Sequence, residues 1–166
     1  MRTIQSIYLI GFMGSGKSTV GQALATKLNK TYIDTDQYIE EKYGSIPKIF
    51  RDKGEDVFRL YEMNALQETL HYQIISTGGG IVEKIENLHK MKENGIIFYL
   101  HTSFHEISKR LGQDKNRPLW NRALEENKKL YHRRIPKYEE FSDYKIITDG
   151  KTIQEIVHEI IKQSNV

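Results

Sequence analysis

Residues 11–18 of the sequence, GFMGSGKS, have the composition and spacing of a loop that holds phosphates. They match the pattern G-x-x-x-x-G-K-[ST] and lie between a β-rich apolar segment and a segment with helical spacing. Glycines let the backbone curl so that its N–H groups point inward, and the amino terminus of the following helix adds partial positive charge. Lys17 would reach the β- and γ-phosphates, and the Ser18 hydroxyl would be a ligand of Mg²⁺. We therefore expect a nucleoside triphosphate site that comprises Gly14, Ser15, Gly16, Lys17, Ser18 and Thr19.

Two aspartates separated by a single residue form a second group of side chains that could take part in a reaction. They are Asp34 and Asp36, in the segment TYIDTDQYIE (31–40), directly after a short apolar run. In an extended strand, residues two apart point to the same side, so both carboxylates would project from one edge of a sheet. The two carboxylates would repel each other there unless a cation or a hydrogen-bond donor bound one of them, so that each had a different partner.

Length and composition indicate a globular protein made of one domain, residues 1–166. The chain is 38% hydrophobic and 28% charged, and its net charge of +3 comes from basic residues that are spread out. This pattern predicts no nucleic-acid partner. The absence of cysteine excludes disulfides and thiolate metal sites, and fits a cytoplasmic protein. No apolar run is long enough for a secretory signal or a membrane span, so we expect a soluble protein with no membrane partner.

Short apolar segments alternate with segments of helical spacing along the whole chain. Strands are expected at 4–10, 31–34, 73–77, 95–101 and 143–150. Helices are expected at 16–30, in three pieces over 35–71, and at 81–94, 103–111, 122–141 and 152–163, with Pro136 as a point of distortion. This order predicts an α/β fold in three layers, with a parallel sheet covered by helices on both faces. Such sheets bind ligands at the carboxyl ends of their strands, where the polar clusters lie.

The phosphate-binding pattern alone does not name a reaction, because several classes of protein share it. Guanine-specific switches typically contain N/T-K-x-D after a late strand, and this chain has no such segment. ATP-driven machines usually end a strand in Asp or Asp-Glu, whereas the third expected strand here ends in STGGG (76–80). The chain is also short for a mechanical protein. These observations favour a small-molecule kinase.

Six motifs in a fixed order resemble the shikimate kinase family, in the nucleoside-monophosphate-kinase-like group of folds. They are GFMGSGKST (11–19), DTD (34–36), GEDVFR (54–59), STGGG (76–80), RPL (117–119) and R-x-x-x-Y (134–138). The resemblance extends from residue 4 to about residue 150. It implies five parallel strands in the order 2-3-1-4-5, a substrate-binding segment at 34–62 and a lid loop at 112–122. The implied reaction moves the γ-phosphoryl of ATP to the 3-hydroxyl of shikimate, with Mg²⁺, in aromatic amino-acid biosynthesis. A monomer is expected.

The resemblance also implies an acceptor pocket, and the residue types suit a small carboxylated ring. Arg59 and Arg134 offer bidentate contacts to a carboxylate, a geometry that lysine cannot match. Glu62 would orient Arg59 through an ion pair at i, i+3, unless it is surface charge. Phe50 and Phe58 would form an apolar wall, or are simply core residues. The substrate-binding residues expected on this basis are Asp36, Phe50, Phe58, Arg59, Gly78, Gly79, Gly80 and Arg134.

Roles for the two aspartates follow as a hypothesis. Asp34, at the strand end, would hold Mg²⁺ through its water shell, because Mg²⁺ keeps several waters. Asp36 would accept a hydrogen bond from the reacting hydroxyl and either position it or remove its proton; its alternative role is that of a helix N-cap. Arg117 resembles the family's lid arginine, and Arg110 its adenine-stacking arginine. The expected catalytic residues are Lys17, Asp36 and Arg117.

Two other functions stay open from the sequence. One is a kinase of the same fold that acts on gluconate or a nucleoside monophosphate. The combination of Arg59, the three glycines at 78–80 and Arg134 argues against it, because a carboxylated ring explains all of them together. The other is a regulator that binds ATP without transferring phosphate. Dependence of ATP consumption on an added acceptor would distinguish it from a kinase.

Overall fold

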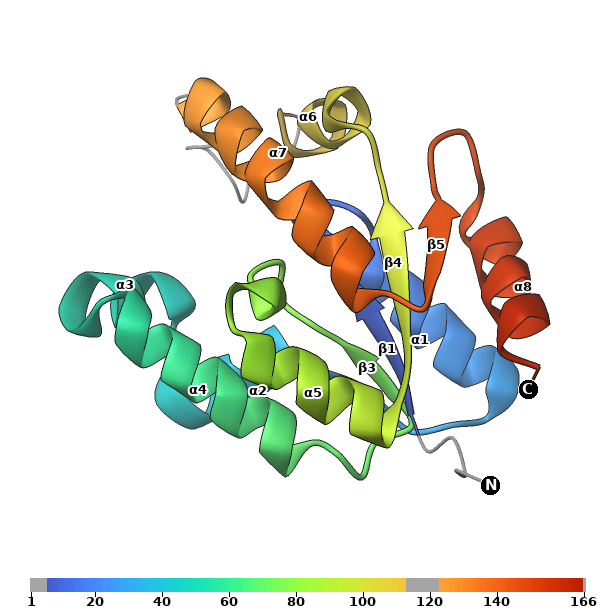
Figure 1. Ribbon diagram of the computed structural model, residues 1–166, viewed down its shortest axis with the longest axis horizontal. Helices are drawn as coiled ribbons and strands as arrows, with labels where there is room; N and C mark the ends of the chain where they lie inside the picture. Colours follow the sequence, from blue (N-terminus) through green and yellow to red (C-terminus); the bar gives the residue numbers. More distant parts are fainter. Residues whose placement is uncertain (1–5, 113–122, 166) are drawn as a thin grey trace.

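The computed structural model describes residues 6–112 and 123–165, which are arranged around a five-stranded parallel sheet (Figure 1). The sheet contains β1 (Ser6–Ile10), β2 (Tyr32–Asp34), β3 (Ile74–Ser76), β4 (Gly95–His101) and β5 (Tyr144–Ile147). Their order across the sheet is β2-β3-β1-β4-β5, and every pairing is parallel. The predicted fold class and strand order are confirmed.

Burial on both faces explains why the central strand is a continuous apolar run. All five residues of β1 are buried, and Leu9 pairs with Ser76 of β3 on one side and with Phe98 of β4 on the other. Strands covered on both faces favour such runs over alternating patterns. This register places the carboxyl ends of β1, β2 and β3 along one edge of the sheet, so the segments that follow them meet there.

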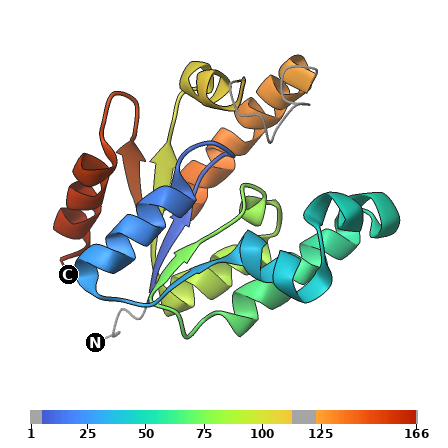
Figure 2. The ribbon, with the colours of Figure 1, turned by 180° about the vertical axis from the view of Figure 1, so that it is seen from behind.

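Helices cover both faces of the sheet, as Figures 1 and 2 show from opposite sides. On one face, α1 (Lys17–Leu28) and α8 (Ile153–Ser164) pack against the sheet through a cluster that includes Leu24 and Ile160. The other face is covered by α5 (Ile85–Asn94), α6 (Phe104–Gly112) and α7 (Leu124–Phe141). This three-layer arrangement holds α1 rigidly behind the phosphate-binding loop.

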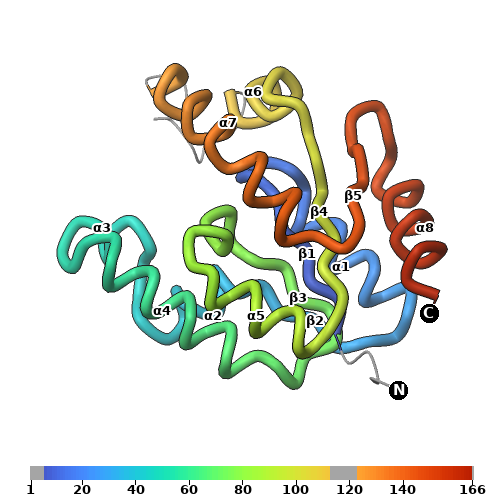
Figure 3. Tube along the Cα trace, in the orientation of Figure 1, coloured from blue at the N-terminus to red at the C-terminus, as the bar shows by residue number. Residues whose placement is uncertain are grey.

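The segment between β2 and β3 forms three helices that project beyond the sheet edge. They are α2 (Thr35–Tyr43), α3 (Ile46–Lys53) and α4 (Glu55–Glu68), and α3 lies at the opposite end of the molecule from α8 (Figure 3). Three pieces were predicted here; the breaks between them fall at Gly44 and Gly54, and both glycines have positive φ values, 98° and 86°. A small apolar core that includes Ile39, Ile49 and Phe58 joins the three helices.

One helix prediction differs in detail from the structure. The segment expected to be one helix at 81–94 is a 3₁₀ turn, η1 (Ile81–Glu83), followed by α5, because Lys84 is extended with φ −123° and ψ 123°. Pro136 lies inside α7, within the helix expected at 122–141. Among the described residues, none of the helices is long and apolar enough to span a membrane.

Candidate active site

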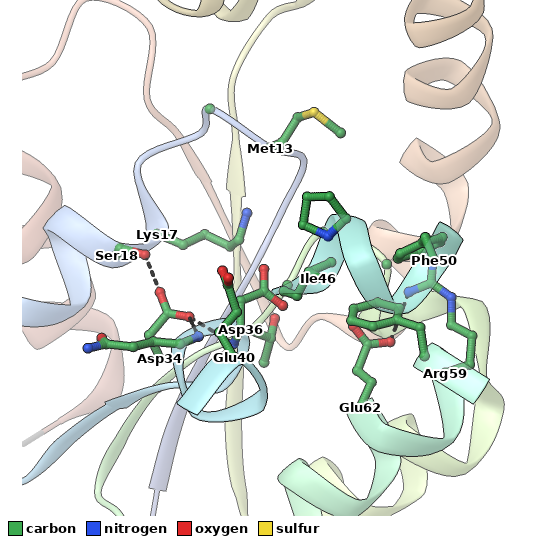
Figure 4. Close-up of a pocket in the computed structure, with 18 of the residues that line it drawn as sticks. Met13, Lys17, Ser18, Asp34, Asp36, Glu40, Ile46, Phe50, Arg59 and Glu62 are labelled. Carbon is green, nitrogen blue, oxygen red and sulfur yellow. Dashed lines mark hydrogen bonds and ion pairs between the residues drawn. The ribbon is translucent and has the colours of Figure 1, made fainter. Parts of the chain in front are cut away.

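A cleft of about 1170 Å³ opens at the carboxyl edge of the sheet (Figure 4). Its walls come from the loop after β1, from α2, α3 and α4, from the glycine segment after β3, and from α7. Residues predicted to bind the nucleotide and residues predicted to bind the acceptor therefore face one space. Those that line the cleft are Gly14, Gly16, Lys17, Ser18, Thr19, Asp34, Asp36, Phe50, Phe58, Arg59, Gly78, Gly79, Gly80 and Arg134.

The loop after β1 has the backbone that a phosphate cradle requires. Gly14 and Gly16 have φ values of 79° and 92°, a region that strains other residues. Gly16 is the N-cap of α1, and no side chain caps the helix or places an acidic group in its first turn. The first N–H groups of α1 thus face the cleft without a side-chain acceptor, which suits an anion.

Lys17 folds back over this loop. Its Nζ donates to the carbonyl oxygens of Gly11 and Phe12, at 2.7 and 2.9 Å, and the side chain is almost fully buried. Ser15 is also buried and its N–H donates to Phe12, which closes the turn. The ammonium is therefore fixed inside the loop, near the position where a bound phosphate would lie.

Asp34 ends β2 and begins α2, so the two aspartates are not in one strand as predicted. Its Oδ1 accepts hydrogen bonds from the N–H groups of Asp36 (2.9 Å) and Gln37 (3.2 Å), which makes Asp34 the N-cap of the helix. The strand expected at 31–34 does end at Asp34, but a shared extended segment for both aspartates was wrong, because α2 starts directly after this cap. The Oδ2 of Asp34 accepts a hydrogen bond from the Ser18 hydroxyl. An oxygen-only pair of this kind suits Mg²⁺.

Asp36 lies in the first turn of α2, half-buried, and its side chain projects toward the same space as that of Lys17 (Figure 4). Burial raises the pKa of its carboxyl to about 6, and the negative charge of Asp34 adds to the rise, while Lys17 and Arg59 act against it. A carboxylate with this pKa is a stronger proton acceptor than an exposed aspartate and is still mostly ionised at neutral pH. The alternative that Asp36 is the N-cap is excluded, because Asp34 is.

Arg59 is fixed by two carboxylates of its own helix, α4. Its Nη1 donates to Glu62 Oε1 at 3.0 Å, and its Nη2 donates to Glu55 Oε1 at 3.2 Å. The predicted i, i+3 pair with Glu62 is confirmed, and Glu62 is buried. Burial raises the pKa of Glu62 to about 7 against the opposing effect of Arg59. The Oε2 of Glu62 has no hydrogen-bond partner.

The three glycines at 78–80 pack directly against charged side chains of the cleft. A Cβ at Gly80 would lie 2.1 Å from Nη1 of Arg59, and one at Gly78 would lie 2.5 Å from Oδ1 of Asp36. A Cβ at Gly79 would meet its nearest neighbour only at 3.4 Å. Packing against these charged groups therefore explains Gly78 and Gly80 without reference to a ligand.

Arg134, on α7, reaches the cleft from the opposite wall and has a partner that the sequence did not indicate. Its Nε donates to Glu83 Oε1 at 3.0 Å, and both side chains are largely buried. Glu83 ends η1, 51 residues before Arg134, so no local pattern pairs them. The hydroxyl of Tyr138, the last residue of the R-x-x-x-Y motif, donates to the Gly79 carbonyl at 2.6 Å.

The remaining predicted residues differ in their placement. The rings of Phe50 and Phe58 lie 4.7 Å apart; Phe58 is buried and Phe50 is 38% exposed, so the pair is both core and cleft wall. Arg110 donates to the Gly14 carbonyl at 3.0 Å and pairs with Glu106, which places it beside the phosphate loop. Arg117 and most of the predicted lid, 112–122, lie outside the described residues.

Comparisons with known proteins agree with this arrangement. The family model described as shikimate kinase matches residues 13–165. The chain belongs to the shikimate kinase family. The shikimate kinase of Persephonella marina is 43% identical over 161 residues, which cover 95% of this chain and 98% of that protein. The shikimate kinase of Bacillus cereus is 41% identical over 166 residues, covering 98% and 100%.

A solved structure extends the comparison to three dimensions. The shikimate kinase from Acinetobacter baumannii in complex with shikimate is 36% identical to this chain, with a TM-score of 0.88, and covers 97% of this chain and 93% of its own. The recognition from six motifs is thus confirmed, as is the fold. Shikimate kinases are ATP-dependent kinases, so the family sets aside both the regulator and the gluconate or nucleotide kinase.

Proposed function

We propose that this chain transfers the γ-phosphoryl group of ATP to the 3-hydroxyl of shikimate, giving shikimate 3-phosphate and ADP. The observation that supports it most strongly is the single cleft that combines a phosphate loop with two buried arginines and a carboxylate of raised pKa. A small acceptor with a carboxylate and several hydroxyls matches these groups. In chorismate biosynthesis, this reaction converts one ring hydroxyl into a phosphate ester.

ATP would bind with its phosphates over the loop at 11–18. Lys17 would exchange its carbonyl partners for phosphate oxygens, and the N–H groups at the start of α1 would donate to them. Ser18 and Asp34 would hold Mg²⁺, directly and through water. When bound there, Mg²⁺ would neutralise charge on the phosphates. Among the described residues, no group of three His, Cys, Asp or Glu side chains gathers as an alternative metal site.

The acceptor would bind on the side of Arg59 and Arg134, with its carboxylate between the two guanidinium groups. Asp36 would then lie between the acceptor and Lys17, where it can accept a hydrogen bond from the reacting hydroxyl. Phosphoryl transfer depends mainly on positioning and charge stabilisation, so the grip of Asp36 on the hydroxyl is the main contribution that we assign to it. Arg117 is proposed to add positive charge over the phosphates, and Arg110 to contact the nucleotide.

The proposal includes one kinase domain that acts as a monomer in the cytoplasm, with ATP and shikimate as its small-molecule partners. The test is release of ADP from ATP and Mg²⁺ with no acceptor, with shikimate, and with quinate, gluconate or AMP. We expect ADP release that depends on shikimate and exceeds the rate with the other acceptors by at least about a hundredfold. Equal rates with and without shikimate would contradict the proposal.

A further inference from the structure

Three cationic side chains on one face of α7 surround the carboxylate of Glu83. Its carboxylate lies 3.0 Å from Arg134 Nε, 3.7 Å from Arg133 Nη2 and 3.6 Å from Lys137 Nζ. It is the last residue of η1, four residues beyond Gly79, the glycine that α7 contacts through Tyr138. Unlike Arg134, Glu83 does not line the cleft, because its carboxylate faces the cationic side chains of α7.

The two carboxylate oxygens of Glu83 have different partners. Oε1 accepts the hydrogen bond from Arg134, whose side chain is only 7% exposed, while Oε2 faces Arg133 and Lys137, which are 62% and 38% exposed. Burial raises the pKa of Glu83, but Arg134, followed by Lys137 and Arg133, outweighs burial and leaves the pKa below its usual value. Glu83 is therefore ionised at neutral pH and forms a charge-assisted bond with the buried arginine.

This bond sets the orientation of the guanidinium of Arg134. With Nε bound to Glu83, Nη1 lies beside Gly79, 3.6 Å from the position of a Cβ on that glycine. Gly79 itself is fixed by the hydroxyl of Tyr138. Because a guanidinium is planar, an acid on its Nε leaves the outer edge, Nη1 and Nη2, to face the cleft that Arg134 and Gly79 line.

We infer that Glu83 is a positioning residue of the acceptor site, which binds Nε of Arg134 and so presents the outer edge of that guanidinium to the acceptor carboxylate. The inference rests on the proposed function. Glu83 would support Arg134 as Glu62 supports Arg59, because in both cases a carboxylate binds a nitrogen of a buried guanidinium. Three cations around one carboxylate also leave the wall of the cleft with a positive excess.

Two other roles for Glu83 predict different results. If Glu83 acted only through the long-range repulsion between its negative charge and an anionic acceptor, removing the charge would raise the affinity for shikimate. If the ion pairs only held η1 against α7, loss of Glu83 would lower stability and affect both substrates alike. A positioning role predicts weaker binding of the acceptor alone.

The experiment compares Glu83→Ala and Glu83→Gln with the wild type and with Glu86→Gln, an exposed acid on α5 outside the cleft. For each protein, KM for shikimate and for ATP, kcat, the Kd for shikimate by calorimetry and the thermal midpoint are measured. We expect Glu83→Ala to raise KM and Kd for shikimate about tenfold, the size of a lost charge-assisted hydrogen bond. Glu83→Gln keeps a neutral acceptor and should restore about half of that loss on a logarithmic scale, with KM for ATP unchanged.

A second pair of variants tests whether Glu83 acts through Arg134. In the Arg134→Ala background, Glu83→Ala should no longer change the Kd for shikimate, because its target is absent. An unchanged or lower Kd in the single variant, or an equal effect in both backgrounds, would overturn the inference. A wild-type enzyme that neither binds nor phosphorylates shikimate would instead overturn the proposed function.

Discussion

Arg59 Nη1 lies 3.0 Å from Glu62 Oε1, one turn further along α4, and both side chains are buried where the helix faces the cleft. The pair fixes a cationic fork before any acceptor arrives, so less side-chain entropy is lost on binding. The cost is visible in Glu62, whose second oxygen lacks a hydrogen-bond partner and whose pKa is raised to about 7 by burial. Orienting Arg59 therefore requires that Glu62 be buried in a less stable state than an exposed carboxylate.

Alanine substitutions in the glycine segment should separate binding from turnover. Gly80→Ala would place a methyl group 2.1 Å from Nη1 of Arg59, and Gly78→Ala would place one 2.5 Å from Oδ1 of Asp36. We expect Gly80→Ala mainly to raise KM for shikimate and Gly78→Ala mainly to lower kcat, each by about tenfold or more. Steady-state kinetics with shikimate as the varied substrate measure both.

Gly79→Ala is the matched comparison within the same segment. Its methyl group would have 3.4 Å to the nearest atom, so its effect on either parameter should be the smallest of the three. If Gly79→Ala were as damaging as its neighbours, the packing of Gly78 and Gly80 against charged side chains would not be the reason for the glycines.

Replacing Asp36 with asparagine should remove most turnover while ATP still binds. Asparagine keeps the shape of the side chain but loses the charge that we propose holds the reacting hydroxyl, so we expect kcat to fall by about a hundredfold or more. Stopped-time ADP assays give kcat, and nucleotide titration gives the Kd for ATP. Asp52→Asn, an exposed residue outside the cleft, is the control for a general effect of such a change. Normal turnover in Asp36→Asn would show that the charge of Asp36 is not needed for the reaction.

The same variant should be more stable than the wild type, and only at higher pH. The pKa of Asp36 is about 6 in the folded protein and about 3.9 when unfolded, so the folded state binds more protons between these values. Stability is therefore lost as pH rises through this window, at a cost of about 3 kcal/mol near neutral pH. Asp36→Asn avoids that cost. Denaturant unfolding should show a gain near pH 7.5 that disappears near pH 4; a gain of equal size at both would contradict the raised pKa.

Ser18→Ala tests the proposed Mg²⁺ site. The variant loses the hydroxyl that donates to Asp34 and that would bind the metal, while Lys17 and the loop glycines are retained. We expect the Mg²⁺ concentration for half-maximal turnover to rise by about tenfold at saturating ATP. A Mg²⁺ titration of the ADP assay measures this, and Ser142→Ala, at a partly exposed serine outside the cleft, is the control. An unchanged titration would exclude Ser18 as a ligand.

Local patterns predicted those parts of the molecule that depend on neighbours in the sequence. The apolar run of β1 predicted a buried strand, and the glycine pattern predicted a curled loop, because burial and backbone conformation depend there on adjacent residues. The pair of Arg59 with Glu62 was predictable for the same reason, since i, i+3 positions meet on a helix.

Contacts between distant segments were not predictable in this way. Nothing near Arg134 in the sequence indicates Glu83, because the two meet only when η1 packs against α7. The reason for Gly80 is likewise a guanidinium 21 positions earlier in the chain. Asp34 was correctly assigned to the end of a strand, but its second role as the cap of α2 was not predicted, because the same residue type fits both positions. The role of Arg117 stays a prediction.

The most direct test of the proposed reaction is the product itself. Wild-type protein is incubated with ATP, Mg²⁺ and shikimate, and the mixture is followed by phosphorus and proton magnetic resonance. The proposal predicts one phosphate ester on ring carbon 3 of shikimate, formed in equal amounts with ADP. Inorganic phosphate in place of an ester, or an ester on another hydroxyl, would contradict the placement of the acceptor between Asp36 and the two arginines.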